Sequence, residues 1–228
     1  MSEQLLPACA ACLFKLGGRI CVRPDGKHPV FCPTEGMPEL AQKSLKSLQN
    51  NPEQLRLAQE SACVEGAGYT HKDSIPRPAR PRIAEIIDFA KRMDYKKLGF
   101  IFCMGLREEA AVTLKIFESN GFEVVSTACK VGGVAKSEIG VPPEWQLDCT
   151  SRETMCNPLL QAEICNSMNV EFNILLGLCV GHDSLVLQHL KAPATVFAVK
   201  DRLLGHNPLA AIYTSNTYYR YMKEPYEE

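Results

Sequence analysis

The sequence lacks three features that would place it at a membrane, on nucleic acid or outside the cell. No run of about 18 apolar residues occurs, so we expect no membrane-spanning helix and no membrane partner. The 25 Lys and Arg residues are balanced by 26 Asp and Glu residues, so a nucleic-acid partner is not expected. The first residues, Met1 to Gln4, lack the basic start of a signal peptide, so we expect a cytoplasmic location.

The sequence also lacks the common glycine-rich and nucleophile signatures. It contains no G-x-G-x-x-G after an apolar run, no phosphate-binding P-loop and no G-x-S-x-G. A nicotinamide cofactor therefore has no support. There is no internal repeat, and the 46% hydrophobic content suffices for one globular core with a small appendage.

Cysteine, in contrast, is abundant. The chain has 11 cysteines, and in a reducing compartment such a number indicates metal binding or redox chemistry more often than disulfides. Four of them fall in the first 32 residues with the spacing C-x2-C-x8-C-x10-C, which is typical of a four-thiolate metal site. These predicted ligands are Cys9, Cys12, Cys21 and Cys32.

The identity of this N-terminal metal is left open by the spacing. Zinc sites usually use two close cysteine pairs, whereas one close pair plus two separated thiolates, the last followed by Pro33, favours a [4Fe–4S] cluster slightly over zinc. A disulfide pair is the third alternative. Glycines and prolines interrupt residues 1–36, so this segment needs a metal to organise it.

The rest of the chain divides into two parts. Residues 37–95 are expected to hold helices beginning at Pro38 and at Asn51–Pro52, a linker or wrapping loop over 67–82, and an amphipathic helix near 83–90. Residues 96–228 alternate apolar strands with helices, which predicts a Rossmann-like α/β domain: a parallel sheet with helices on both faces. The expected strands are 98–103, 122–128, 171–178 and 194–199, and the expected helices are 107–120, 158–169 and 183–190.

Cysteines follow three of these strands. With the strands in the spatial order second, first, third, fourth, Cys103, Cys129 and Cys179 would meet at the carboxyl edge, where ligands bind in open α/β sheets. Cys156, before a helix N-terminus at the end of the long loop 130–156, could complete a second four-sulfur set that holds a cluster or metal. The alternative is an incidental group of small buried residues. Cys63 and Cys165 are expected in the helical core, and Cys149 is not assigned.

Polar residues follow the same strand ends. We expect His182 or Asp183 to handle protons, and four cations near this edge would suit an anionic substrate. Solvated loop charge and helix capping are the alternative interpretations. The candidate catalytic residues are His182, Asp183, Lys200, Asp201 and Arg202. Further candidate cofactor-binding residues are Arg107 and His206, with Lys130 as the fourth flanking cation.

Three stretches carry a resemblance to a known family. They are the Cys9–Cys32 pattern, the string GLCVGHD at 177–183, and the string KDRLLGHNP at 200–208. The chain resembles a prokaryotic cysteine-rich "metal-binding protein" family held as a domain of unknown function. The resemblance implies a four-cysteine metal module on an α/β domain and no particular reaction. A looser similarity to hybrid-cluster proteins and nickel carbon monoxide dehydrogenases lies only in the order of features.

Two functions follow from these patterns. The first is an iron–sulfur redox protein, and potentially an oxidoreductase, with an electron-transfer partner and a small anionic substrate. The second is a zinc-stabilised domain that binds or senses a small molecule without catalysis. A tyrosine-rich tail is a candidate either to cover the core or to form a homodimer contact. Its tyrosines are Tyr213, Tyr218, Tyr219, Tyr221 and Tyr226.

Overall fold

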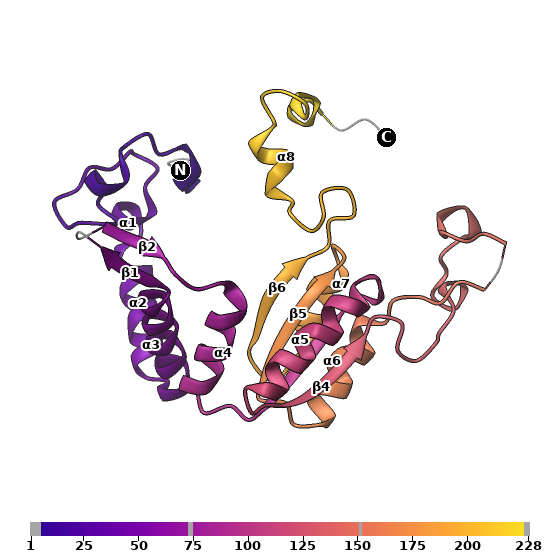
Figure 1. Cartoon of the computed structure of the whole chain (residues 1–228). Helices are drawn as coiled ribbons and strands as arrows, with labels where there is room; N and C mark the ends of the chain where they lie inside the picture. The colour runs from indigo at the N-terminus through magenta and orange to yellow at the C-terminus, as the bar shows by residue number, and fades with distance from the viewer. Residues whose placement is uncertain (1–5, 73–74, 151, 226–228) are drawn as a thin grey trace. The chain divides into compact units, whose positions relative to one another are not determined.

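The computed structural model describes residues 6–72, 75–150 and 152–225 (Figure 1). The chain forms two compact units, Met1–Cys63 and Val64–Glu228. Within the described ranges, no helix is both long and apolar enough to cross a membrane.

The first unit contains short turns followed by helices. These helices are α1 (Pro33–Gly36), α2 (Pro38–Gln49) and most of α3 (Pro52–Ala67), whose last turn belongs to the second unit. The predicted starts of α2 and α3 are confirmed, and the Asn51 side chain accepts a hydrogen bond from the Gln54 N–H, as a helix cap does. The prediction that Cys63 belongs to a helical core is wrong, because its side chain is exposed. In α3 the buried residue is its neighbour Val64, and adjacent helical positions point in different directions.

The prediction of an irregular linker over 67–82 is also wrong in part. Strands β1 (Tyr69–Lys72) and β2 (Ile75–Pro78) pair antiparallel, with Tyr69 opposite Pro78. The Ala79 N–H donates to the Gly68 carbonyl across the pair. Bonded positions alternate along an antiparallel ladder, so the nitrogens of Pro76 and Pro78 face outward, where no donor is needed.

The second unit is built on a four-stranded parallel sheet. Its strands are β3 (Lys97–Phe102), β4 (Glu123–Ala128), β5 (Phe172–Leu178) and β6 (Ala194–Val199). The order is β4-β3-β5-β6 with every neighbouring pair parallel, which confirms the expected sheet and its strand order.

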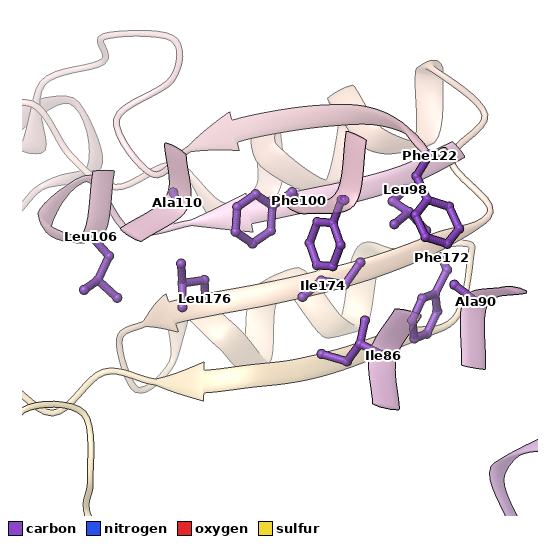
Figure 2. Close-up of a cluster of buried hydrophobic side chains, with 11 residues drawn as sticks. Ile86, Ala90, Leu98, Phe100, Leu106, Ala110, Phe122, Phe172, Ile174 and Leu176 are labelled. Carbon is purple, nitrogen blue, oxygen red and sulfur yellow. The ribbon is translucent and has the colours of Figure 1, made fainter. Parts of the chain in front are cut away.

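Helices cover both faces of this sheet, as expected for a Rossmann-like α/β fold. On one face, α4 (Arg82–Arg92) and α5 (Arg107–Ser119) pack on Phe100 and Ile174 (Figure 2). On the other, α6 (Pro158–Ser167) and α7 (His182–His189) pack on Ile101 and Leu175. Successive strand residues point to opposite faces, so one apolar strand supplies both cores. Cys165 is fully buried in the second core, as predicted.

The long loop between β4 and α6 returns on itself. Ala135 forms an antiparallel bridge with Thr154, and the Lys136 and Glu153 side chains form an ion pair of 2.9 Å with both partners mostly buried. The two ends of the loop therefore run side by side. As a result, Asn157 at the start of α6 donates its N–H to the Cys129 carbonyl at 2.8 Å.

Candidate functional site

Sheet register brings Cys103 and Cys129 together. Phe102 at the end of β3 pairs with Ala128 of β4 and with Leu176 of β5. Cys103 follows Phe102 and Cys129 follows Ala128, so these two cysteines lie beside each other. The Cys103 N–H also donates to the Leu176 carbonyl at 3.0 Å. The carboxyl edge thus carries two thiols at neighbouring positions.

The other two cysteines reach the same edge from different segments. The long loop returns Cys156 to the end of β4, where its thiol contacts that of Cys129. Cys179 follows β5 in a tight turn in which its carbonyl accepts the N–H groups of His182 and Asp183, at 3.0 and 3.1 Å. Electrostatic interaction links Cys156 to Cys179 and to Cys103. All four predicted cysteines therefore converge.

Three of the thiols form a hydrogen-bonded chain in which Cys103 donates to Cys129, and Cys129 donates to Cys156. Donation to Cys129, together with burial, raises the pKa of Cys103 to about 12. The bond from Cys129 lowers the pKa of Cys156 to about 7, aided by the charge of Lys130 and opposed by burial. The Cys129 sulfur also accepts the Met104 N–H at 3.2 Å. In the metal-free chain the negative charge therefore concentrates at Cys156.

A cation lies near each of the three outer thiols, which are those of Cys103, Cys156 and Cys179. The charge of the Lys200 ammonium favours the thiolate of Cys103, and that of the Lys130 ammonium favours the thiolate of Cys156. The Arg202 guanidinium donates to the Cys179 sulfur at 3.0 Å. Such cations stabilise thiolates, the form of cysteine that binds metals.

The two acidic candidates at this edge are engaged in local turns. The Asp201 carboxylate accepts the N–H groups of Leu203 and Leu204, at 3.0 and 2.7 Å. The Asp183 carboxylate accepts the N–H of Ser184 at 2.8 Å. These hydrogen bonds lie in the first turn of α7 and in the turn that follows Lys200.

His182 is the first residue of α7, close to the thiols. Burial lowers the pKa of its imidazole, and the charge of Lys130 adds to this effect. Cys103 and Asp183 act in the opposite direction but are smaller influences than burial. The neutral ring is a proton acceptor at ordinary pH.

Two further candidates face other partners. Arg107 is exposed, and its guanidinium lies 3.6 Å from the Glu108 carboxylate. The His206 ring nitrogen Nδ1 lies 3.2 Å from the Asp201 N–H and 3.2 Å from the Val199 carbonyl, so this ring closes the turn after β6. His206 has a positive φ of 65°, consistent with that tight turn. Neither contact involves a thiol.

Sequence reasoning missed Gln161, which sits beneath the thiols. Its side chain is fully buried, and its amide nitrogen donates to the Thr127 carbonyl at 2.7 Å and to the Phe102 carbonyl at 3.3 Å. These carbonyls belong to the last residues of β4 and β3. Gln161 therefore links the two strands by hydrogen bonds just before Cys129 and Cys103. Its place in a buried helical stripe is the signal that could have found it. The stripe is Pro158, Gln161, Ala162 and Cys165.

We expect Gln161→Leu to destabilise the fold by about 1–3 kcal/mol, because two buried carbonyls lose their donor. Urea unfolding measures this loss. Gln161→Glu, which keeps the side-chain length but replaces the amide donor by a carboxyl group, should be at least as costly. If Gln161→Leu unfolds at the same urea concentration as the wild type, Gln161 does not hold the strand ends.

The four N-terminal cysteines lie around tight turns. Cys9 and Cys12 flank a 3-10 turn closed by the Cys12 N–H on the Cys9 carbonyl, and Arg19 donates to the Cys12 carbonyl at 3.2 Å. Cys32 precedes α1. Its pKa is lowered because donation from the Glu35 and Thr34 N–H groups and the Thr34 hydroxyl together outweighs burial, the largest single influence.

The donor chemistry at both cysteine sets fits a thiolate-bound metal. Soft sulfur ligands select zinc and iron–sulfur clusters. Among residues 6–72, 75–150 and 152–225, however, no three His, Cys, Asp or Glu side chains are arranged to hold a metal ion as they stand. Metal binding at Cys9, Cys12, Cys21 and Cys32, and at the strand ends, stays a prediction.

The fold and its thiol-bearing edge define a Rossmann-like α/β protein preceded by a small cysteine-rich unit. The chain belongs to the family described as "Protein of unknown function (DUF1847)", whose model matches residues 32–197. It is also 42% identical over 176 residues to an uncharacterised protein of Methanocaldococcus jannaschii, a match that covers 77% of this chain and 84% of that protein. The resemblance to a family of unknown function is confirmed.

The family match has informative bounds. It includes the four edge cysteines Cys103, Cys129, Cys156 and Cys179. It begins at Cys32, after the other three N-terminal cysteines, and ends inside β6, before Lys200. The thiols of the edge thus all fall within the matched segment.

Proposed function

We propose that this chain is a metal-binding redox protein that holds an iron–sulfur cluster at the carboxyl edge of its sheet. The ligands would be the four thiols that converge there: Cys103, Cys129, Cys156 and Cys179. The four N-terminal cysteines would hold a second centre, either a [4Fe–4S] cluster or zinc.

The convergence of the four thiols is the observation that carries this proposal. They arrive from the ends of three strands and from a long returning loop, and each outer thiol has a cation beside it. Thiolates gathered in a partly buried edge repel one another, so most must stay protonated without a metal. The hydrogen bond to Cys129 and burial raise the pKa of Cys103, and the charge of Cys129 adds to this effect. The hydrogen bond from Cys103 lowers the pKa of Cys129, but the bond to Cys156 and burial outweigh it and leave that pKa raised. A bound cation or cluster removes the repulsion between thiolates.

The residues around the thiols have distinct parts in this proposal. A bound cluster would supply one-electron transfer, with its potential set by nearby charges and hydrogen bonds. Lys130, Lys200 and Arg202 would offset the negative charge of the thiolates. The neutral His182 imidazole would accept a proton near the edge. An electron-transfer partner and a small anionic substrate complete the proposal.

Anaerobic reconstitution with iron and sulfide tests the edge site. We expect the wild-type protein to turn brown and to absorb light at about 400 nm, as iron–sulfur clusters do. The Cys103→Ala, Cys179→Ala double variant should bind about four fewer iron atoms per chain, the content of one [4Fe–4S] cluster. Iron and acid-labile sulfide per chain are the measured quantities.

The control removes two exposed cysteines instead. The side chains of Cys63 and Cys149 are exposed, and neither residue is a proposed ligand, so a Cys63→Ala, Cys149→Ala double variant should bind as much iron as the wild type. Equal iron in all three proteins would rule out a cluster at the edge. A colourless protein that retains zinc would instead support the zinc-stabilised binding domain.

A further inference from the structure

Among the described residues, three cations at the carboxyl edge have no acidic partner. Within the ranges that the structure describes, Lys130, Lys200 and Arg202 form no ion pair with a carboxylate, whereas Lys97 pairs with Glu123 and Lys136 with Glu153. Lys130 instead donates to the Thr154 carbonyl, and Arg202 donates to the Cys179 sulfur.

Lys200 stands out among the three. It is partly buried, and its ammonium has no hydrogen-bond acceptor among the described residues. Holding a charge in a partly buried place without a partner is costly unless a ligand supplies the partner. Of the three cations, Lys200 is therefore the one whose ammonium hydrogens are all without an acceptor among the described residues.

Two glycines lie beside the Lys200 ammonium. A Cβ atom added to Gly105 would lie 3.7 Å from the Lys200 nitrogen and 3.9 Å from the Cys103 sulfur. A Cβ added to Gly177 would lie 3.8 Å from the same nitrogen. The ammonium thus lies between the ends of β3 and β5, against backbone that carries no side chain.

Two carboxylates lie at the same edge but are engaged elsewhere. Asp183 and Asp201 accept backbone N–H groups in their own turns. Within the described ranges neither forms an ion pair with Lys130, Lys200 or Arg202. The Lys200 ammonium is therefore left to bind a ligand.

We infer that the carboxyl edge binds a small carboxylate-type oxoanion, with Lys200 as its principal donor and Arg202 and Lys130 as the surrounding positive charge. Ammonium and guanidinium groups bind carboxylate-type oxygens through charge-assisted hydrogen bonds. Only the role of this anion as a substrate rests on the proposed redox function. The binding itself depends on the cations and can be tested separately.

The probe is 13C-labelled formate, titrated at constant ionic strength and followed by its NMR linewidth. Wild-type protein should broaden the signal in a saturable way, both metal-free and after reconstitution. Lys200→Met should weaken binding about tenfold or more, because a charge-assisted donor is lost. Lys200→Arg should retain binding because it keeps the charge. Lys115→Met, an exposed lysine on α5, should match the wild type.

The outcomes separate the two proposals. Absence of saturable broadening with the wild type, or equal binding by Lys200→Met and the wild type, overturns the anion site. Circular dichroism of each variant shows whether it is folded, and Lys200→Arg supplies the comparison if Lys200→Met is not. Formate binding that depends on Lys200 in a protein that takes up no iron would support the anion site and reject the cluster.

Discussion

In metal-free protein at pH 7, iodoacetamide is expected to modify Cys156 on the order of 100-fold faster than Cys103. With pKa values of about 7 and about 12, the two thiols differ by more than four orders of magnitude in thiolate content. The lower intrinsic reactivity of a weakly basic thiolate removes part of this difference. Both side chains are partly exposed, so access does not separate them.

Peptide mass spectrometry at timed intervals measures the two rates. The rate of Cys156 modification should rise with pH to a plateau, with a midpoint at about 7, because only the thiolate reacts. In urea the two cysteines should react at similar rates, because the hydrogen-bonded thiol chain is lost. Equal rates in the folded protein would show that the Cys103–Cys129–Cys156 chain does not form.

Gly26→Ala is expected to disrupt the N-terminal cysteine unit. A Cβ at this position would lie 2.2 Å from the Arg19 carbonyl carbon and 2.3 Å from the Ile20 nitrogen. These are backbone atoms, which cannot move aside to relieve the clash as the end of a flexible side chain can. The turn in which Lys27 donates to the Gly18 carbonyl would therefore open. We expect metal affinity of the unit to fall about tenfold or more.

Competition with a chromophoric chelator measures this affinity, in a background where Cys103 and Cys179 are replaced by alanine. Hydrogen exchange of residues 18–27 gives a second, metal-independent measurement, and it should accelerate in Gly26→Ala. The matched control is Gly17→Ala, because no atom lies within 4 Å of a Cβ added there. If both variants bind metal as the parent does, the tight turn does not organise the site.

The sheet could be predicted because its strands are unambiguous. β5 is buried at every position, and its sequence is an unbroken apolar run apart from Asn173. Strand order and the position of Cys103 then follow from the rules for alternating strands and helices. The meeting of Cys103 and Cys129 was predictable for the same reason, since both cysteines come directly after strand ends.

Other features depend on contacts that leave no local pattern. The position of Lys200 near Cys103 and the hydrogen bond from Arg202 to Cys179 depend on how the turn after β6 is folded. Cys63 was misplaced because apolar spacing alone does not say which face of a helix finds a partner. The β1–β2 hairpin was missed because prolines usually end strands, and their outward placement becomes visible only in the paired register.

That outward placement has a consequence for the hairpin's free side. A β-strand at a sheet margin normally offers a row of amide hydrogens to which a strand from another molecule can attach. On β2 the outward nitrogens belong to Pro76 and Pro78, which have no hydrogen to offer. The outer edge of β2 therefore offers no amide hydrogen at two alternate positions of this four-residue strand, and strand addition from another molecule is disfavoured on that edge.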